Sequence, residues 1–97
     1  MATYIVLSKF TQQGISRAKD VPARIDAGRR TARAMGTEIK AWYGAVGRYD
    51  VITIWEAPSD EAMAKSILAL TSLGNVTSET LRVFTEDEFR KLMVDLP

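Results

Sequence analysis

The segment that decides the fold of this chain runs from residue 49 to residue 57 and reads 49-YDVITIWEA-57. Alternate side chains of a β-strand point to opposite faces of a sheet. In this segment both faces are apolar, because one carries Ile52 and Ile54 while the other carries Tyr49, Val51 and Trp55. A strand with this pattern is expected to be covered on both sides.

Residues 3–10, which read TYIVLSKF, have the same property. Ile5 and Leu7 alternate with Tyr4, Val6 and Phe10. The helices of a small domain cover one face of its sheet, and an apolar second face left in water would form a large exposed patch. We therefore expect another molecule, most simply a second copy of this chain, to cover that face and make at least a dimer.

Length and charge exclude several classes of protein. A chain of 97 residues makes one domain, residues 1–97, and its apolar fraction of 46% is that of a globular protein. Its 13 basic and 12 acidic residues give a net charge of +1, so we expect no nucleic-acid or membrane partner. No apolar run approaches the roughly 18 residues of a membrane span, and the N-terminus lacks a signal-peptide pattern. The expected location is the cytoplasm.

The chain contains no cysteine and no histidine. Disulfides, thiolate metal sites, cysteine nucleophiles and histidine bases are therefore excluded together. Acid–base chemistry would have to use Asp, Glu, Tyr or Lys. The acidic run Glu86-Asp87-Glu88 suits the first turn of a helix better than a metal site. We expect neither a metal nor a cofactor.

The order of signals is strand, helix, strand, strand, helix, strand, helix. Strands are predicted at residues 3–10, 37–46, 49–57 and 76–84. Asp20 is the predicted N-cap of the first helix, which Gly36 ends. The turn Pro58-Ser59-Asp60 caps the second helix, which ends at Gly74. Thr85 and Glu88 form a capping box for the last helix.

This order predicts an α+β fold, a ferredoxin-like βαββαβ sandwich with an extra C-terminal helix. Its four-stranded antiparallel sheet would carry helices on one face. The set assigned to the helix-covered face is Ile5, Leu7, Ala41, Ile52, Ile54, Leu81 and Val83. The set assigned to the opposite face is Tyr4, Val6, Trp42, Val51, Thr53, Trp55, Thr80 and Arg82.

The two middle strands form a predicted hairpin with a two-residue turn at Gly47-Arg48. In this register Trp42 lies across from Thr53, and Lys40 lies across from Trp55. A slip of one residue would exchange the two faces of the strand.

Several short motifs occur in a specific order along the chain, namely Tyr4-Ile5-Val6-Leu7, Gly47-Arg48-Tyr49-Asp50, Glu56-Ala57-Pro58, Ser72-Leu73-Gly74-Asn75-Val76 and Glu79-Thr80-Leu81-Arg82. With this spacing the chain resembles the GYD domain family over nearly its whole length. The resemblance implies a ferredoxin-like protein similar in plan to dimeric α+β barrel proteins. It implies no established activity and no catalytic residues. Arg29-Arg30 in the first helix departs from the pattern.

The turn motif Gly47, Tyr49 and Asp50 has two interpretations. In the structural one, Gly47 supplies a positive φ and Asp50 accepts backbone hydrogen bonds. In the functional one, Tyr49 and Asp50 are an acid–base pair at the mouth of a pocket. Adjacent strand residues point to opposite faces, which argues against their convergence on one substrate atom.

Tyr4, Trp42, Trp55 and Arg82 are the candidate ligand-binding residues. Aromatic walls with a few polar groups are typical of small-molecule sites, and Arg82 could hold a carboxylate. The same residue types are enriched in protein interfaces, so these four could instead form a dimer contact.

Three functions are compatible with these features. The favoured one is a homo-oligomeric binding and assembly domain. The second is a cofactor-independent enzyme of the dimeric α+β barrel type, such as a small monooxygenase or isomerase acting on an aromatic or lactone-like compound. It would need a buried polar cavity beside Trp42, Trp55 and Arg82. The third is a small-molecule-sensing module.

Overall fold

A computed structural model describes the whole chain, Met1–Pro97. Its elements are β1 (Ala2–Phe10), α1 (Gln12–Ser16), the 3-10 turn η1 (Ala18–Asp20), α2 (Val21–Ala34), β2 (Glu38–Gly44), β3 (Val51–Ala57), α3 (Asp60–Thr71), β4 (Val76–Val83) and α4 (Glu86–Val94). The strands form one sheet in the order β2-β3-β1-β4, and each neighbouring pair is antiparallel. The ferredoxin-like α+β fold with an extra C-terminal helix is therefore confirmed.

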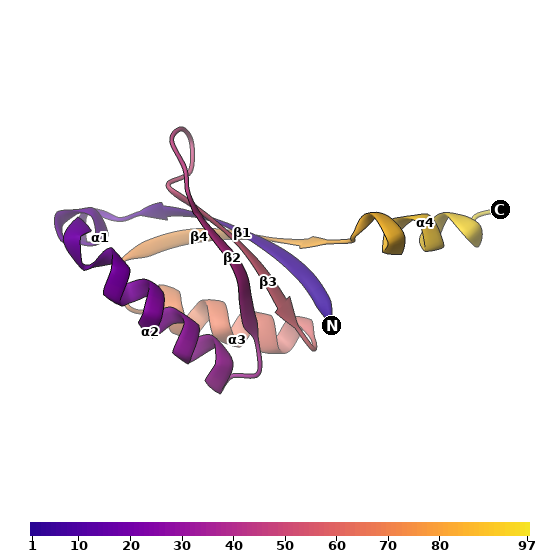
Figure 1. Cartoon of the computed structure of the whole chain (residues 1–97), viewed down its shortest axis with the longest axis horizontal. Coiled ribbons are helices and arrows are strands. Elements are labelled where there is room, and N and C mark those ends of the chain that lie inside the picture. Colours follow the sequence, from indigo (N-terminus) through magenta and orange to yellow (C-terminus); the bar gives the residue numbers. More distant parts are fainter.

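Both long helices of the sandwich, α2 and α3, lie on the same side of the sheet (Figure 1). No helix packs closely against the other side. β1 is central, because it pairs with β3 along one edge and with β4 along the other. We call the side under α2 and α3 the covered face and the other side the open face.

The assignment of residues to these two faces from sequence is wrong, and the faces are exchanged. Tyr4, Val6 and Trp55 are buried against the helices, with Trp55 only 2% exposed. Ile5 and Ile54, expected beneath the helices, lie on the open face. The alternation of side chains along the strands could not show which of the two apolar sets faces the helices, because both sets have the same period. The bulky aromatic set fills the space between sheet and helices, and the slimmer aliphatic set is left outside.

Hydrogen bonds on the covered face explain why it accepts polar side chains. The indole Nε1 of Trp55 donates to Thr53 Oγ1 at 2.7 Å. Thr37 Oγ1 lies 2.9 Å from Ser66 Oγ and donates to the carbonyl of Ala32. No buried side-chain nitrogen or oxygen lacks a partner. A hydroxyl-bearing strand can therefore face the core without a desolvation penalty for unpaired groups.

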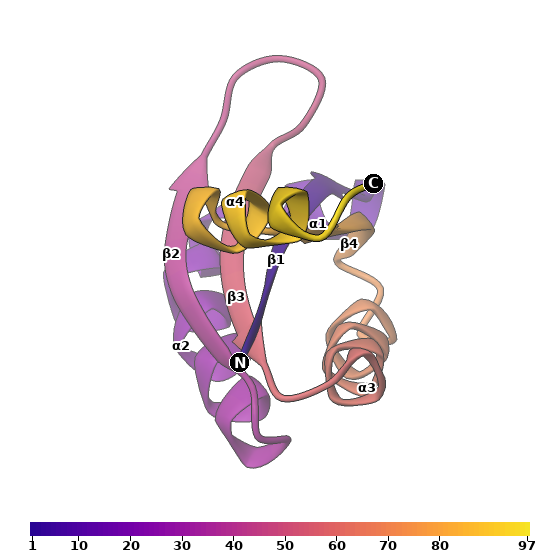
Figure 2. The ribbon, with the colours of Figure 1, turned by 90° about the vertical axis from the view of Figure 1, so that its right-hand side faces the viewer.

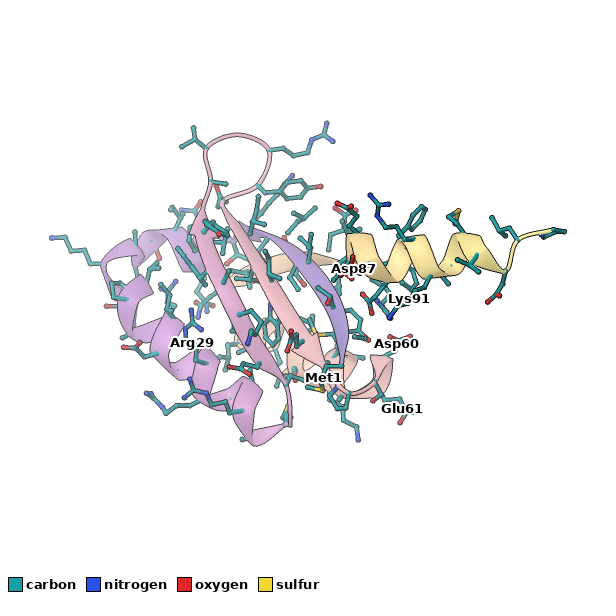
Figure 3. The ribbon with its side chains drawn as sticks, turned by 45° about the vertical axis from the view of Figure 1, so that its right-hand side comes forward. Met1, Arg29, Asp60, Glu61, Asp87 and Lys91 are labelled. Atoms are coloured by element: carbon teal, nitrogen blue, oxygen red, sulfur yellow. The ribbon has the colours of Figure 1, made fainter.

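The β2–β3 register is confirmed at Trp42, which pairs with Thr53, but not at Lys40. A bulge at Lys40 places Ile39, not Lys40, across from Trp55. Ile39 and Trp42 thus both face the helices, although an unbroken strand would point residues three apart to opposite faces. Arg29, labelled on α2 in Figure 3, donates from Nη1 to the carbonyl of Ile39 beside the bulge at 2.7 Å.

The helix ends largely follow the sequence signals. Ser59 accepts a hydrogen bond from Ala62 N at the start of α3, and Thr85 with Glu88 forms the complete capping box of α4. Gly36 has a φ of +79° just after α2, as the helix end requires. Asp20 occupies the N-cap position of α2, but its side chain makes no capping hydrogen bond.

The short helix α1 is absent from the sequence-based prediction, which has only a polar stretch there. Thr11 caps it by accepting from Gly14 N, and its hydroxyl also donates to the carbonyl of Gly74 at 2.6 Å. Gly14 presses against the α3–β4 turn, where a Cβ would lie 2.0 Å from the carbonyl oxygen of Asn75. Only glycine fits this contact.

Helix α4 stands apart from the sandwich, beyond the end of β4 (Figure 1). Figure 2 views the molecule from this end, with α4 in front of the strands. None of its residues is buried. Phe89, Leu92 and Met93 recur at the spacing of one helix side and are all exposed, as is Leu96 just beyond the helix end. No helix of the chain is long and apolar enough to span a membrane.

Candidate functional site

A cavity of about 190 Å³ lies between α2, α3 and the covered face, and it is partly open to solvent. Its apolar walls include both tryptophans of the chain, Trp42 from β2 and Trp55 from β3. Val6 from β1, Ile25 from α2 and Leu70 from α3 also line it. The opposite end of the same layer is filled by a cluster of buried side chains that includes Ala32, Ala57 and Met63.

Arg24 is the charged residue of the cavity wall. Arg24 and Asn75 also line a neighbouring polar hollow, together with Gln13, Arg17 and Asp20. The guanidinium of Arg24 is held by two backbone carbonyls, since Nη1 donates to Gly14 and Nη2 donates to Arg17, each at 3.0 Å. These bonds fix a positive charge where the apolar cavity meets the polar hollow.

The cavity wall offers hydroxyl groups but no acid–base group. Ser8, Thr31, Thr53, Thr71 and Ser78 line it, whereas no aspartate, glutamate, lysine or tyrosine does. An arginine stays protonated near neutral pH and cannot serve as a base there. The cavity can therefore hold a molecule but has no group of its own to move a proton.

The structure brings only two of the four predicted ligand-binding residues into this cavity. Trp42 and Trp55 line it, while Tyr4 and Arg82 lie outside it. The Tyr4 hydroxyl donates to the carboxylate of Asp60 at the start of α3, a residue labelled in Figure 3. Burial, followed by the hydrogen bond to Asp60, raises the pKa of Tyr4. Arg82 is exposed and lies over the ring of Phe84, 4.4 Å from its centroid.

The turn motif connects the β2–β3 hairpin to β1 through hydrogen bonds of Asp50. The loop has four residues, 46–49, not two, because the last backbone bond runs from Ala45 N to Asp50 O at 2.8 Å. Gly47 adopts the expected positive φ, at +141°. Asp50 Oδ2 accepts from Phe10 N at 2.9 Å, and Asp50 N donates to Ser8 O. Asp50 thus extends the β1–β3 ladder with its side chain.

Tyr49 and Asp50 do not converge on one point. The hydroxyl of Tyr49 donates to Glu79 of β4 at 2.6 Å, while Asp50 binds β1. The hydrogen bond to Glu79 is the main cause of the raised pKa of Tyr49. Lys9 lies 5.8 Å from the centroid of the Tyr49 ring. This arrangement makes a polar rim at one end of the open face.

The open face is a second candidate site. Its aliphatic side chains are Ile5, Leu7, Ile52, Ile54, Leu81 and Val83. The strand register sets Ile5 between Ile54 and Leu81, so three strands contribute to one continuous row. All six side chains are partly or fully exposed, and Leu81 is 42% exposed. No polar side chain interrupts the row of Ile54, Ile5 and Leu81.

Sequence reasoning missed Arg24 and Asn75. Arg24 is one of several basic residues in the first third of the chain, and its spacing does not distinguish it from Arg17 or Arg33. Asn75 appears in the sequence as part of a helix-ending turn. Their place at the cavity depends on α1, which the sequence did not reveal.

Comparisons with known proteins point to one family. The family model described as the GYD domain matches residues 4–93. A glutamine synthetase and cystathionine beta-lyase binding protein of Thermus thermophilus is 34% identical over 82 residues, which cover 84% of this chain and 86% of that protein.

Two solved structures share the fold. A feast or famine regulatory protein from M. tuberculosis, complexed with L-methionine, has a TM-score of 0.67 at 15% identity, with 88% of this chain covered. This chain spans about half of that regulator, since the match covers 51% of it. A protein from Thermus thermophilus has a TM-score of 0.57 at 21% identity, over 88% of this chain and 95% of its own. At these identities the likeness concerns the fold alone.

Proposed function

The chain belongs to the GYD domain family, and on that basis we propose that it is a homo-oligomeric binding domain without catalytic activity. Two copies pack through the open faces of their sheets. The assembled domain then binds a protein partner. The observation that carries this proposal is the uncovered aliphatic row formed by Ile5, Ile54 and Leu81 and their neighbours.

The composition of the open face supports contact with a second copy. Monomeric proteins rarely leave a continuous apolar patch of this kind in water. Two such faces can pack against each other about 10 Å apart, as sheets do in sandwiches. In a two-fold dimer the same patch serves both subunits, so one aliphatic row is sufficient. Lys9, Tyr49 and Glu79 would then lie at the rim of the contact.

Helix α4 supports assembly independently. Its exposed apolar side, formed by Phe89, Leu92 and Met93, has no partner within the chain. We assign this side to the second copy as well. Removal of residues 85–97 should therefore weaken association, while the unfolding midpoint of the sandwich changes little, because α4 adds no buried residue.

The relative from Thermus thermophilus supports a protein partner. Its name states that it binds glutamine synthetase and cystathionine beta-lyase, and this chain matches most of its length. We extend this property to the present chain as a proposal. The test is biolayer interferometry with purified glutamine synthetase and cystathionine beta-lyase from the same organism as this chain. Absence of binding to both would remove the protein-partner half of the proposal.

The cavity supports binding over catalysis. A dimeric α+β barrel-type enzyme would need a polar cavity with a group that moves protons, whereas this wall carries none. An enzyme could still work in this cavity if the substrate itself or a bound water moved the proton. Consumption of an aromatic substrate by wild-type protein, abolished in Trp42→Ala, would therefore favour the enzyme alternative.

The assembly half is tested by size-exclusion chromatography with light scattering. Ile54→Glu places a charge in the centre of the aliphatic row, where burial without a partner costs several kcal/mol. The expected result is a folded monomer. The control is Ala23→Glu, at an exposed position of α2, which should keep the wild-type mass. Equal masses for both variants and for wild type would refute assembly through the open face.

A further inference from the structure

We propose that the cavity beneath α2 and α3 binds a small aromatic monocarboxylate. The ring lies in the apolar part of the cavity, beside Trp42 and Trp55, and the carboxylate points to Arg24 and Asn75 at the mouth. This inference concerns a different face of the sheet from the proposed assembly, so either can fail without the other.

The volume sets the size of the occupant. A dry apolar cavity of about 150 Å³ is large enough to admit benzene. The present cavity, at about 190 Å³, accommodates one ring and a short substituent within its walls. Two hydroxyls of its wall are already hydrogen-bonded within the chain, since Thr53 accepts from Trp55 and Thr71 donates to the carbonyl of Ile67, and most of the remaining wall is apolar. An apolar body is therefore the favoured content.

The charge at the mouth sets the chemistry of the occupant. Arg24 is half-buried, and two carbonyls hold its guanidinium in place. The two ion pairs of the chain join Lys40 to Glu38 and Arg90 to Glu86, so the charge of Arg24 is not neutralised by an ion pair. Arginine has five N–H donors, and the two carbonyls use two of them. The remaining donors suit a carboxylate.

The other charges near the mouth leave room for an anion. The polar hollow contains Arg17 and Arg24 against a single carboxylate, that of Asp20. Asn75 adds an amide, although Gln13 Nε2 donates to its Oδ1 at 3.0 Å. Because that bond uses the oxygen of Asn75 as acceptor, its NH₂ group remains able to donate to a ligand. No acidic residue lines the cavity itself, which disfavours a cationic ligand.

The test uses phenylacetate as the probe and the emission of the two tryptophans as the signal. Both tryptophans of the chain line the cavity, so wild-type protein needs no label. Phenylacetate should change the emission with saturation at about 1 mM or below. Its neutral amide, phenylacetamide, should bind about tenfold more weakly or worse, and phenethylamine should not bind.

Two variants locate the site. Arg24→Gln should raise the dissociation constant of phenylacetate about tenfold or more without changing that of phenylacetamide. The matched control is Arg30→Gln, an exposed position on α2 that lies outside the cavity wall. Gly28→Leu should fill the cavity and abolish binding of both compounds. A Cβ at Gly28 meets only Leu70, at 3.8 Å, so this variant is expected to fold.

Several results would overturn the inference. These are no saturable change with phenylacetate, equal binding of acid and amide by wild-type protein, or unchanged binding in Gly28→Leu. The comparison of acid with amide uses wild-type protein alone. It therefore decides the question even if Arg24→Gln disturbs the contact with Gly14 and fails to fold.

Discussion

The two faces of the sheet are both apolar, yet they are made of different side chains. The covered face mixes aromatic and hydroxyl groups, such as Tyr4, Thr53 and Trp55, and the polar atoms of these three side chains are hydrogen-bonded within the chain. The open face presents a row of aliphatic side chains. A face that needs fixed hydrogen-bond partners is best built within one chain, where the partners are always present. An aliphatic face has no polar side chains that need hydrogen-bond partners, so it suits contact with a second molecule.

Neighbouring positions on β3 test this contrast most severely. Trp55→Glu should abolish the folded state, because loss of a buried Trp costs about 3–5 kcal/mol and an unpaired buried charge adds to it. The total is comparable with the whole stability of a domain of this size. Ile54→Glu, one residue away, should leave a folded chain. Circular dichroism and urea unfolding distinguish the two, and a folded Trp55→Glu would contradict the assignment of faces.

The cavity end of the covered face depends on Gly14, which lies against Asn75 and accepts a hydrogen bond from Arg24. Gly14→Ala places a methyl group into the backbone of Asn75, and we expect a loss of about 3 kcal/mol from such overpacking. The comparison variant is Gly36→Ala, where no atom lies within 4 Å and only the positive φ is strained. Its cost should be about 1 kcal/mol. Urea unfolding of both variants measures the difference, and equal losses would show that the contact is not tight.

The hairpin end, where both faces stop, depends on Asp50. Asp50→Ala removes the acceptor for Phe10 N and should lower the free energy of unfolding by about 1 kcal/mol. Asp50→Asn keeps an acceptor oxygen and should lose less. Hydrogen exchange of the Phe10 amide gives a local reading. Unchanged protection of this amide in Asp50→Ala would mean that the hydrogen bond from Phe10 N to Asp50 does not stabilise this end of the sheet.

The capping box at the start of helix α4, which lies outside both faces, should be weakened by acid. Hydrogen bonds, first with the backbone N–H of Thr85 and then with its side chain, lower the pKa of Glu88. A lowered pKa in the folded state means that the stabilisation is present above the pH at which a free glutamate titrates. It is lost as the pH falls through the lowered value. The protection factor of the Thr85 amide, its exchange rate relative to that of an unstructured chain at the same pH, should therefore fall in acid, and Glu88→Gln should remove most of this pH dependence.

The fold could be predicted from the sequence because its signals were local. Ser59, Thr85 and Gly74 mark helix ends through short-range hydrogen bonds and a positive φ, and the order of elements follows from them. The register of Trp42 against Thr53 was also accessible from the hairpin.

The face assignment could not be predicted in the same way. Two apolar sets of the same period differ only in how they pack against helices far away in sequence. The residues of the cavity could be predicted only in part, because some of them reach it through contacts between segments far apart in the sequence. Trp42 and Trp55 stood out by residue type, whereas Arg24 reaches the cavity only because Gly14 and Arg17 hold it there. The bulge at Lys40 likewise has no sequence signal that would predict it.

Sedimentation equilibrium of the wild-type chain shows whether the open aliphatic face is an interface between copies of this chain, each with a mass of 10.8 kDa. At micromolar concentration we expect twice this mass or a higher even multiple. A single species of 10.8 kDa throughout the concentration range would contradict it.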